Sequence, residues 1–549
     1  MEKKTSAMGT TGNADRRWGP LSAWWPCGVL CLWGLVLRMV AVGKVFPAPA
    51  DVSHFVQYGK EYAVTGTLES LSPLWSLGPQ LLSAWCMKLG WMPQSVLQWL
   101  SVAFGVLSVA GVYALARELT GGRSVAVVAG LFVATNPILT ELAATGYAET
   151  AHYALGAWTL AFAFAGARTR RAWLFALAAV AASLDLFFRS FDLFLWLGAA
   201  GPFVLWRLRG CGWLQGAKLV GTAVAVGAVC ALPFFLVTHA VSGWNPGHSK
   251  LSNLAIAESG TNAKELYAVE GLDGEQAPLV LRTKELERDG VFRYLWTHKA
   301  EIARRYPGNV ATGVRVLNAH AFAGMFRLGL FWFLLAGILC AAGMRGWTGW
   351  YMWLSVMSVL GSIALGFVNT RWVVQCVPFV AILAGGGFAW LFSRFPDRRL
   401  HGLLWGVLLA AGFLNGRWAV ARLDDEWKQR NVYTVCERLH RWMGEGERIM
   451  CFTPELPALF YTTNALSWLV IPYDTVERVF AQADARGADC IVLDDSTLDH
   501  FPIHEIERHP ELVPTPWKEV DKLEFEKETR FELERNVWRV YRREGWENP

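Results

Sequence analysis

Two carboxylates and two arginines lie at the ends of apolar segments of the chain, where an ionisable side chain is costly and needs a reason. Asp51 is the first carboxylate after the apolar run 21–43, and Glu149 opens a later run. Arg189 and Arg371 lie at the ends of two more. A carboxylate can take a proton from a hydroxyl group, and an arginine can bind a phosphate through two parallel hydrogen bonds. If these side chains meet at one membrane surface, they suit a lipid phosphate substrate.

Asp51 also has a purely structural interpretation. Pro47 and Pro49 disfavour helix before it, and the segment 53–64 carries aromatic and apolar residues partly on one side. This pattern predicts a short helix that lies in the membrane interface. An aspartate directly before a helix commonly caps its first N–H groups. Asp51 is therefore either a helix cap or a catalytic carboxylate, and the rest of the chain must distinguish the two.

Other ionisable residues fall on the same side of the predicted membrane, and some have simpler structural roles. Asp185 and Arg189 are spaced i, i+4 and are expected to pair on a helix surface. Lys44 is expected to extend its ammonium group toward the lipid headgroups. Three further residues are candidates for the site: Arg38, His54 and His152. Asp192 and His320 are expected at the same depth in the membrane. A single histidine such as His152 is more often a packing residue than a ligand.

The elements that must position these residues are membrane spans. Of the 549 residues 53% are hydrophobic, with 29 Trp and 31 Phe, which is too apolar for a soluble protein of this length. Apolar runs of about 17 to 25 residues, long enough to cross a bilayer, occur about eleven times. They cover 21–43, 95–117, 123–140, 149–167, 172–188, 191–207, 217–240, 321–343, 348–367, 371–393 and 401–420. Only Arg189 and Ser190 separate the fifth run from the sixth, which predicts a tight hairpin.

Basic residues predict the orientation of these spans. If the N-terminus is cytoplasmic, the inner loops hold most of the Arg and Lys, whereas the short outer loops hold mainly Arg189 and Arg371. This is the positive-inside pattern. It predicts a cytoplasmic segment 1–20, a membrane domain 21–420 with outer loops 44–94 and 242–318, and an extracytoplasmic tail 421–549. No cleavable signal peptide is evident, so the first run is expected to remain as a membrane helix.

The tail lacks long apolar runs and instead alternates short apolar segments with charged ones, which predicts a small α/β domain. Its candidate elements are a charged helix at 424–443, strands at 448–452, 466–471, 490–494 and 537–542, and a helix at 475–486. A part of the outer loop, 291–306, also looks helical. The ten cysteines include no Cys-x-x-Cys pair, so neither a zinc site nor a disulfide framework is indicated. The net charge of +5 is small and gives no indication of nucleic-acid binding.

The order of these motifs resembles the GT-C superfamily of polyprenyl-phosphate-sugar glycosyltransferases. The nearest group is family 39, which includes protein O-mannosyltransferases and the lipid A aminoarabinose transferase. The motifs are Leu37-Arg38-Met39, Asp51-Val52, Ser72-Pro73-Leu74-Trp75, Ala116-Arg117, Asn136-Pro137, Glu149, Phe188-Arg189-Ser190, and Asn369-Thr370-Arg371-Trp372 followed by Pro378. Three positions depart from the family pattern. Val52 replaces the second acid of an Asp-Glu pair, and Trp372 replaces a tyrosine. The lysine of the Lys-Pro-Pro-Leu segment in the aminoarabinose branch is either replaced by Ser72 or absent. These departures leave the substrate branch open, and they leave open an inactive relative.

The resemblance implies a GT-C fold and inverting transfer of a sugar from a polyprenyl-phosphate donor to a hydroxyl of a protein, lipid or glycan. It implies that Asp51 is the general base, that Glu149 orients the acceptor or the sugar, and that Arg189 and Arg371 hold the leaving phosphate. It implies no particular cofactor, leaves a divalent metal ion open, and favours a bacterial inner membrane. Two alternatives stay open: a transporter or flippase of a lipid-linked sugar, and a non-catalytic scaffold that presents the tail. A transporter would place these residues around a cavity at the membrane midplane.

Overall fold

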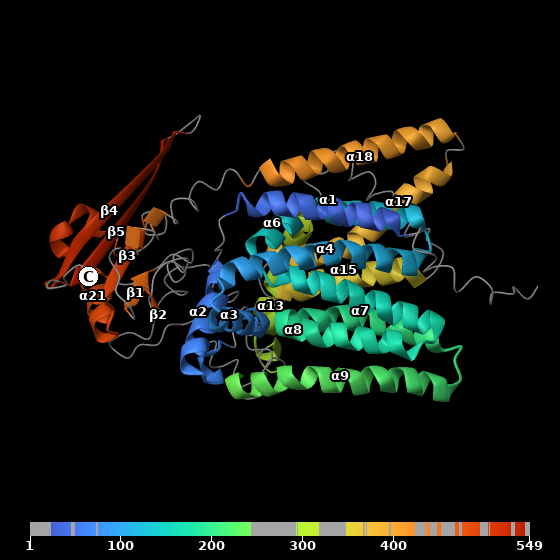
Figure 1. The fold of residues 1–549 in the computed structure, drawn as a ribbon, viewed down its shortest axis with the longest axis horizontal. Coiled ribbons are helices and arrows are strands. Elements are labelled where there is room, and N and C mark those ends of the chain that lie inside the picture. Colours follow the sequence, from blue (N-terminus) through green and yellow to red (C-terminus); the bar gives the residue numbers. More distant parts are fainter. Residues whose placement is uncertain are drawn as a thin grey trace, which may run out of the picture.

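A computed structural model describes residues 24–242, 293–317 and 347–421 with short gaps, and parts of 423–543. Long helices run side by side through the larger part of this structure (Figure 1). They are α1 (Trp25–Val42), α4 (Pro93–Thr120), α5 (Arg123–Thr135), α6 (Pro137–Thr145), α7 (Glu149–Thr169), α8 (Ala172–Leu208), α9 (Trp213–Ser242), α15 (Trp347–Leu365), α17 (Val377–Arg394) and α18 (Arg398–Ala421). Short segments α16 (Thr370–Val373) and η5 (Val374–Cys376) lead into α17.

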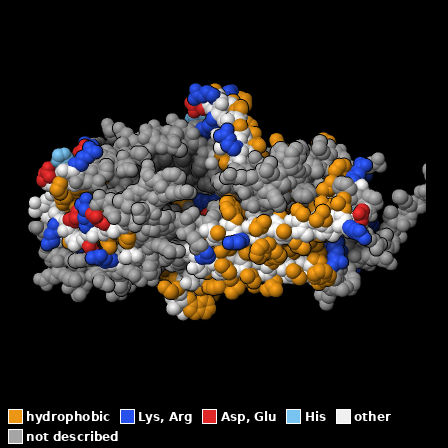
Figure 2. Space-filling model, turned by 90° about the horizontal axis from the view of Figure 1, so that it is seen from above, with side chains coloured by type: hydrophobic (Ala, Val, Ile, Leu, Met, Phe, Trp, Pro, Cys, Tyr) orange, Lys and Arg blue, Asp and Glu red, His pale blue; other side chains and the backbone are white. Residues whose placement is uncertain are grey.

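Ten of the eleven predicted spans coincide with these helices, and the eleventh, 321–343, lies outside the described residues. Within the described part of the chain, seven helices are long and apolar enough to cross a membrane, or eight if α5 and α6 form one bent span. Helix α7 and the second half of α8, Leu195–Leu208, are not among those seven. Exposed apolar side chains cover a broad flank of the bundle, with Lys and Arg near its ends (Figure 2). The protein is an integral, multi-pass membrane protein.

The predicted hairpin is formed within α8. Its backbone leaves the helical conformation at Arg189, where φ is −150° and ψ is 68°. The two ends of α8 meet, because Arg170 before it donates a hydrogen bond of 2.9 Å to the Gly210 carbonyl after it. Phe175 and Leu208, from the two halves, also lie in one hydrophobic cluster. A straight helix of this length would instead separate its ends by about 55 Å.

The third predicted span is broken in the middle. Asn136 separates α5 from α6, and the two helices are bent by 53°. Pro137 has no N–H group to offer the Val133 carbonyl four residues before it, so the last turn of α5 needs other donors. The Asn136 side chain accepts from the Leu139 N–H and begins the new helix.

Two distant helices supply the missing donors. Arg38 of α1 donates to the Val133 carbonyl at 3.3 Å and to the Ala134 carbonyl at 3.2 Å. Asn415 of α18 donates to the Thr135 carbonyl at 2.7 Å. All three accepting groups are buried. The break is therefore stabilised by the packing of α1 and α18 around it.

Short helices lie across one end of the bundle (Figure 1). They are α2 (Ala50–Thr65), η3 (Leu68–Ser70) and α3 (Leu77–Lys88), and they occupy the segment predicted to lie at the interface. Gly59 allows α2 and α3 to pack closely, because a Cβ atom there would lie 2.6 Å from the Gln80 carbonyl. Helix α13 (Lys299–Val316) overlaps the helix predicted at 291–306 but extends further along the chain.

The tail forms a five-stranded sheet in the order β2-β1-β3-β5-β4. The strands are β1 (Arg448–Cys451), β2 (Ser467–Val470), β3 (Cys490–Asp494), β4 (Trp517–Glu528) and β5 (Leu533–Arg543). Strands β2, β1 and β3 are parallel, as predicted, and helix α21 (Val476–Ala485) joins β2 to β3. Strand β4 was not predicted, and most of the predicted helix 424–443 lies outside the described residues. The sheet lies off the same end of the bundle as α2 and α3 (Figure 1).

Candidate functional site

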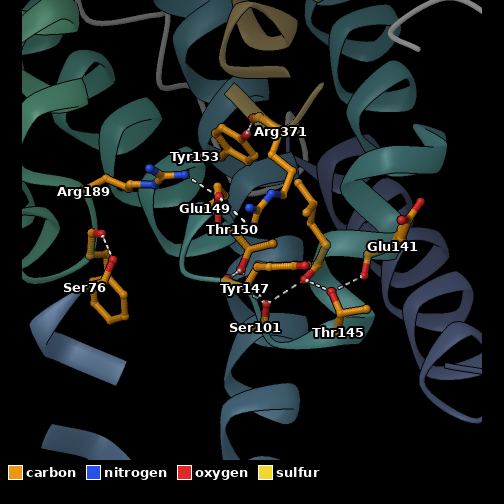
Figure 3. Close-up of polar contacts among 12 residues, drawn as sticks. Ser76, Ser101, Glu141, Thr145, Tyr147, Glu149, Thr150, Tyr153, Arg189 and Arg371 are labelled. Carbon is orange, nitrogen blue, oxygen red and sulfur yellow. Dashed lines mark hydrogen bonds and ion pairs between the residues drawn. The ribbon is translucent and has the colours of Figure 1, made fainter. Parts of the chain in front are cut away.

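Glu149 occupies the first turn of α7 and is the buried centre of the candidate site. Its side chain is 3% exposed, and it accepts a hydrogen bond from Arg189 Nη2. The Nη1 atom of Arg371 lies 3.8 Å from the same carboxylate oxygen. In Figure 3 the two arginines approach Glu149 from different elements. The structure thus brings three of the four predicted principal residues together, although they are far apart in the sequence.

Arg189 reaches Glu149 because it lies at the hairpin of α8. The non-helical backbone at this residue directs its side chain toward the start of α7 (Figure 3). The predicted pairing of Asp185 with Arg189 is not the main contact of either residue. Arg189 pairs with Glu149, and Asp185 lies 2.8 Å from Nδ1 of His152.

Arg371 is positioned by two tyrosines of the α6–α7 region. Its guanidinium lies over the ring of Tyr147, 4.5 Å from the ring centroid. Tyr153 donates a hydrogen bond of 2.8 Å to the Arg371 backbone carbonyl. The side chains of Arg189 and Arg371 are 15% and 23% exposed, against 3% for Glu149. The arginines therefore face the accessible side of the cluster, and the carboxylate lies behind them.

Hydroxyl and amide groups of α4 fix the turn that presents Glu149. Ser101 and Thr150 share a hydrogen bond of 2.5 Å between their hydroxyl groups. Gln98 donates to the Ala144 carbonyl at 2.6 Å. These contacts hold both sides of the 144–150 turn against α4 (Figure 3). The sequence did not single them out, because small polar residues inside an apolar helix carry no local signal of their partners.

His152 and Asp185 form a fully buried pair, and His152 lies about one helical turn after Glu149 in α7. Both side chains are 0% exposed, and the His152 ring also packs against Trp196, with 4.8 Å between centroids. This placement supports the packing role expected for His152. The pair ties α7 to the first half of α8, and hence to the helix that ends in Arg189.

The described contacts of Arg38 and His54 are with residues outside this cluster. Arg38 is fully buried and binds the carbonyls at the α5–α6 break, so its described hydrogen bonds are structural. His54 stacks on Trp75, with 4.5 Å between ring centroids and 19° between planes. The side chain of Asp192 and all of His320 lie outside the described residues.

The side chain of Asp51 lies outside the described residues, but its backbone is placed. Helix α2 begins at Ala50, so Asp51 belongs to its first turn rather than to the N-cap position expected for a simple cap. Its neighbour Val52 is buried in one hydrophobic cluster with Ala148, the residue before Glu149. The start of α2 therefore lies beside the start of α7. This packing also explains the departure at position 52, since a second acid would be buried among apolar groups.

Two guanidinium groups facing one carboxylate leave a surplus of positive charge at the cluster. Such an arrangement suits an anion with several oxygen atoms, because arginine presents a planar fork of donors. Among the described residues no group of three or more His, Cys, Asp or Glu side chains could hold a metal ion.

Comparisons with known proteins agree with this architecture. The family model described as dolichyl-phosphate-mannose-protein mannosyltransferase matches residues 77–236, which run from α3 into α9. None of the curated protein sequences compared with the chain matches it significantly.

Solved structures with a similar fold include ArnT from Cupriavidus metallidurans bound to undecaprenyl phosphate. It is 12% identical, with a TM-score of 0.59 over 93% of this chain and 97% of that chain. The Archaeoglobus fulgidus oligosaccharyltransferase in complex with Zn and sulfate is 14% identical, with a TM-score of 0.54 over 85% and 68%. AglB from the same organism, with an inhibitory peptide and a dolichol-phosphate, is 12% identical, with a TM-score of 0.53 over 96% and 75%. At the level of the fold, the GT-C resemblance predicted from the motifs is confirmed.

Proposed function

We propose that this protein is a membrane glycosyltransferase that moves a sugar from a polyprenyl-phosphate donor to an acceptor hydroxyl on the extracytoplasmic face. The observation that carries the proposal is the convergence of Arg189 and Arg371 on buried Glu149 beside the start of α2. Two of the proteins that share the fold were solved with polyprenyl phosphates, undecaprenyl phosphate in ArnT and a dolichol-phosphate in AglB. The cluster lies at helix ends, whereas a transport site is expected near the membrane midplane.

Arg189 and Arg371 bind the donor phosphate in this proposal. Negative charge grows on the phosphate as the sugar departs, so fixed guanidinium groups stabilise the transition state more than the bound donor. Glu149 sets the position of both guanidiniums before the donor arrives and orients the acceptor or the sugar. Because the arginines are the more exposed members of the cluster, a phosphate can reach them without displacing the buried carboxylate.

Asp51 is the general base. It takes the proton of the acceptor hydroxyl while the acceptor oxygen bonds to the anomeric carbon and the bond from that carbon to the phosphate oxygen breaks. The polyprenyl phosphate leaves with the bonding electrons. A single displacement of this kind inverts the anomeric configuration. An aspartate has an ordinary pKa near 4, so at neutral pH it is already ionised and ready for this role.

The proposed setting follows from the basic loops. They place the N-terminus in the cytoplasm and the domain 421–549 outside it. The resemblance to the family adds a bacterial inner membrane to this proposal. The common placement of α2, the start of α7 and the sheet at one end of the bundle supports a single catalytic face (Figure 1).

The test uses the purified full chain in nanodiscs with a panel of polyprenyl-phosphate sugars. Asp51→Asn keeps the size and shape of the side chain but cannot take a proton. We expect it to fold and to bind undecaprenyl phosphate, with transfer slowed by about 10²- to 10⁴-fold. Turnover within a few-fold of the wild type would contradict the base assignment.

A second arm of the same test examines the phosphate site. Arg371→Lys should lose most donor binding, because lysine cannot reproduce the planar fork. Arg394→Lys is the matched control. Arg394 is the last residue of α17, the helix that follows α16, and its guanidinium stacks on Trp390. If Arg371→Lys binds the donor as tightly as Arg394→Lys does, Arg371 does not bind the donor and its role is structural.

A further inference from the structure

Ser76 lies at the N-cap position of α3, yet its hydroxyl makes no hydrogen bond to its own helix. A serine at this position usually accepts from the N–H groups of the first turn. Here the hydroxyl instead donates to the backbone carbonyl of Phe188 at 2.5 Å, across 112 residues of sequence. Phe188 is the residue directly before the hairpin at Arg189. Figure 3 labels Ser76 and Arg189.

The Phe188 carbonyl lies where α8 stops being regular. The extended backbone at Arg189 interrupts the helix, and a carbonyl beside such a break needs a donor from elsewhere. The ring of Phe188 also packs edge-on against Phe104, with 5.6 Å between centroids. Contacts on both its carbonyl and its ring therefore hold the residue that precedes Arg189.

The loop that carries Ser76 is itself fixed by one buried amide. The Gln80 side chain is 0% exposed. Its oxygen accepts from the Ser72 N–H, and its two N–H donors are shared among the Ser72, Trp75 and Ser76 carbonyls, which lie 3.0 to 3.2 Å from Nε2. The buried amide therefore ties Ser72, Trp75 and Ser76 to the first turn of α3.

A glycine brings this loop against the hairpin. A Cβ atom at Gly78 would lie 3.1 Å from both the Cβ atom and the carbonyl oxygen of Phe187. A side chain at this position would require Phe187 to shift by a few tenths of an ångström, so the glycine serves close approach rather than a turn. Loop and hairpin are in contact over consecutive residues, so a displacement of one displaces the other.

We propose that Ser76 is a positioning residue for Arg189. Its hydroxyl fixes the Phe188 carbonyl and thereby the backbone conformation that directs the Arg189 guanidinium to Glu149. The consequence for donor binding rests on the proposed function: when Ser76 is removed, the phosphate of a polyprenyl-phosphate donor meets an arginine that is less well placed.

The experiment compares Ser76→Ala with Ser83→Ala in the full chain. Ser83 is buried in the same helix and donates a comparable hydrogen bond of 2.8 Å, but to the Pro79 carbonyl within α3. We expect Ser76→Ala to weaken binding of undecaprenyl phosphate about threefold to tenfold, the usual effect of one hydrogen bond. Ser76→Thr keeps the hydroxyl and should restore most of the affinity, while Ser83→Ala should stay near the wild-type value. Equal affinity in Ser76→Ala and wild type would overturn the proposal.

A thermal double-mutant cycle separates this proposal from the proposed function. If the wild type binds no polyprenyl phosphate, the proposed function fails, but the cycle of Ser76→Ala with Arg189→Gln still measures the coupling. We expect Arg189→Gln to lower the melting temperature less in the Ser76→Ala background than in the wild type. Additive shifts would overturn the positioning role. If Ser76→Ala does not fold, Ser76→Cys replaces it, since a thiol keeps the size but is a weak donor.

Discussion

At Glu149, a buried negative charge is balanced by arginines from α8 and α16. Removing one member of a buried ion pair usually costs more than the pair contributes, because the partner is left without its counter-charge. In this site the arginines are partly exposed, so the cost is reduced. The carboxylate is therefore a stabilising group, and it is also the group that keeps both guanidiniums in place before a phosphate arrives.

Glu149→Gln should lower the stability of the ligand-free protein by about 2 kcal/mol, because a neutral amide cannot offset the two guanidiniums. Bound phosphate would supply the missing negative charge. We therefore expect undecaprenyl phosphate to raise the melting temperature of Glu149→Gln by more than it raises that of the wild type. Equal shifts in the two proteins would show that the ligand does not bind at these arginines.

His54 predicts a pH dependence of stability. Burial lowers the pKa of His54 to about 4, whereas an unfolded histidine has a pKa near 6.5. The folded state holds His54 neutral, so its contribution is fully present above about pH 6.5 and is lost as the pH falls toward 4. The loss amounts to at most about 1.4 kcal/mol per pH unit.

The measurement is the apparent melting temperature between pH 7 and pH 4.5 for the wild type and His54→Gln. The wild-type value should fall more steeply than that of the variant. Parallel curves would mean that His54 titrates alike in the folded and unfolded chain.

At the scale of elements, the α5–α6 break gives Arg38 a role that can be separated from the site. Arg38→Met removes the donors to the Val133 and Ala134 carbonyls but keeps a long apolar side chain. A buried carbonyl left unsatisfied costs about 1 to 3 kcal/mol, so the melting temperature should fall. The affinity of the folded variant for undecaprenyl phosphate should stay unchanged. Lost affinity at unchanged stability would instead make Arg38 a donor-binding residue.

Local signals in the sequence predicted one change of direction and missed another. Arg189 and Ser190 interrupt an apolar run and predicted the hairpin, whereas the break before Pro137 lies inside the span predicted at 123–140 and was not predicted. The partners across helices could not be predicted in the same way. Asp185 is four residues from Arg189 but turns to His152, and which face of α7 meets α8 depends on the rotation of two nearly all-apolar helices. Hydrophobic periodicity carries little information about rotation in such helices.

Strand β4 shows a second kind of limit. Its pairing with β5 shifts register between Glu519 and Asp521, so Val520 interrupts the alternation of inward and outward residues. A bulge of this kind removes the period of two by which a strand is predicted. Strands β1, β2 and β3 pair with one another without such a shift and were predicted to within one residue of their bounds, whereas β5 begins at Leu533, four residues before its predicted start.

At the scale of the whole molecule, orientation is the property to test. Single cysteines at Glu69 on η3 and at Glu511 in the tail should react with a membrane-impermeant reagent in intact cells, once the native thiols are removed. A cysteine at Gln215 in the first turn of α9 should react only after the cells are opened. The basic inner loops are the reason for this expectation. Labelling of the Gln215 variant alone would reverse the orientation and the proposed catalytic face.

The spacing of Glu149, Arg189 and Arg371 in the sequence also determines the order in which the site forms during translation. Glu149 and Arg189 are only 40 residues apart, so their pair can form as soon as the α7–α8 region has entered the membrane. Arg371 is translated roughly 180 residues later, which at about 5 to 20 residues per second takes roughly 10 to 40 seconds. Throughout this interval the nascent chain carries an electrically balanced half-site. The surplus positive charge that attracts an anionic lipid appears only when α16 arrives, so a nascent chain that does not yet include Arg371 has little means of capturing a donor.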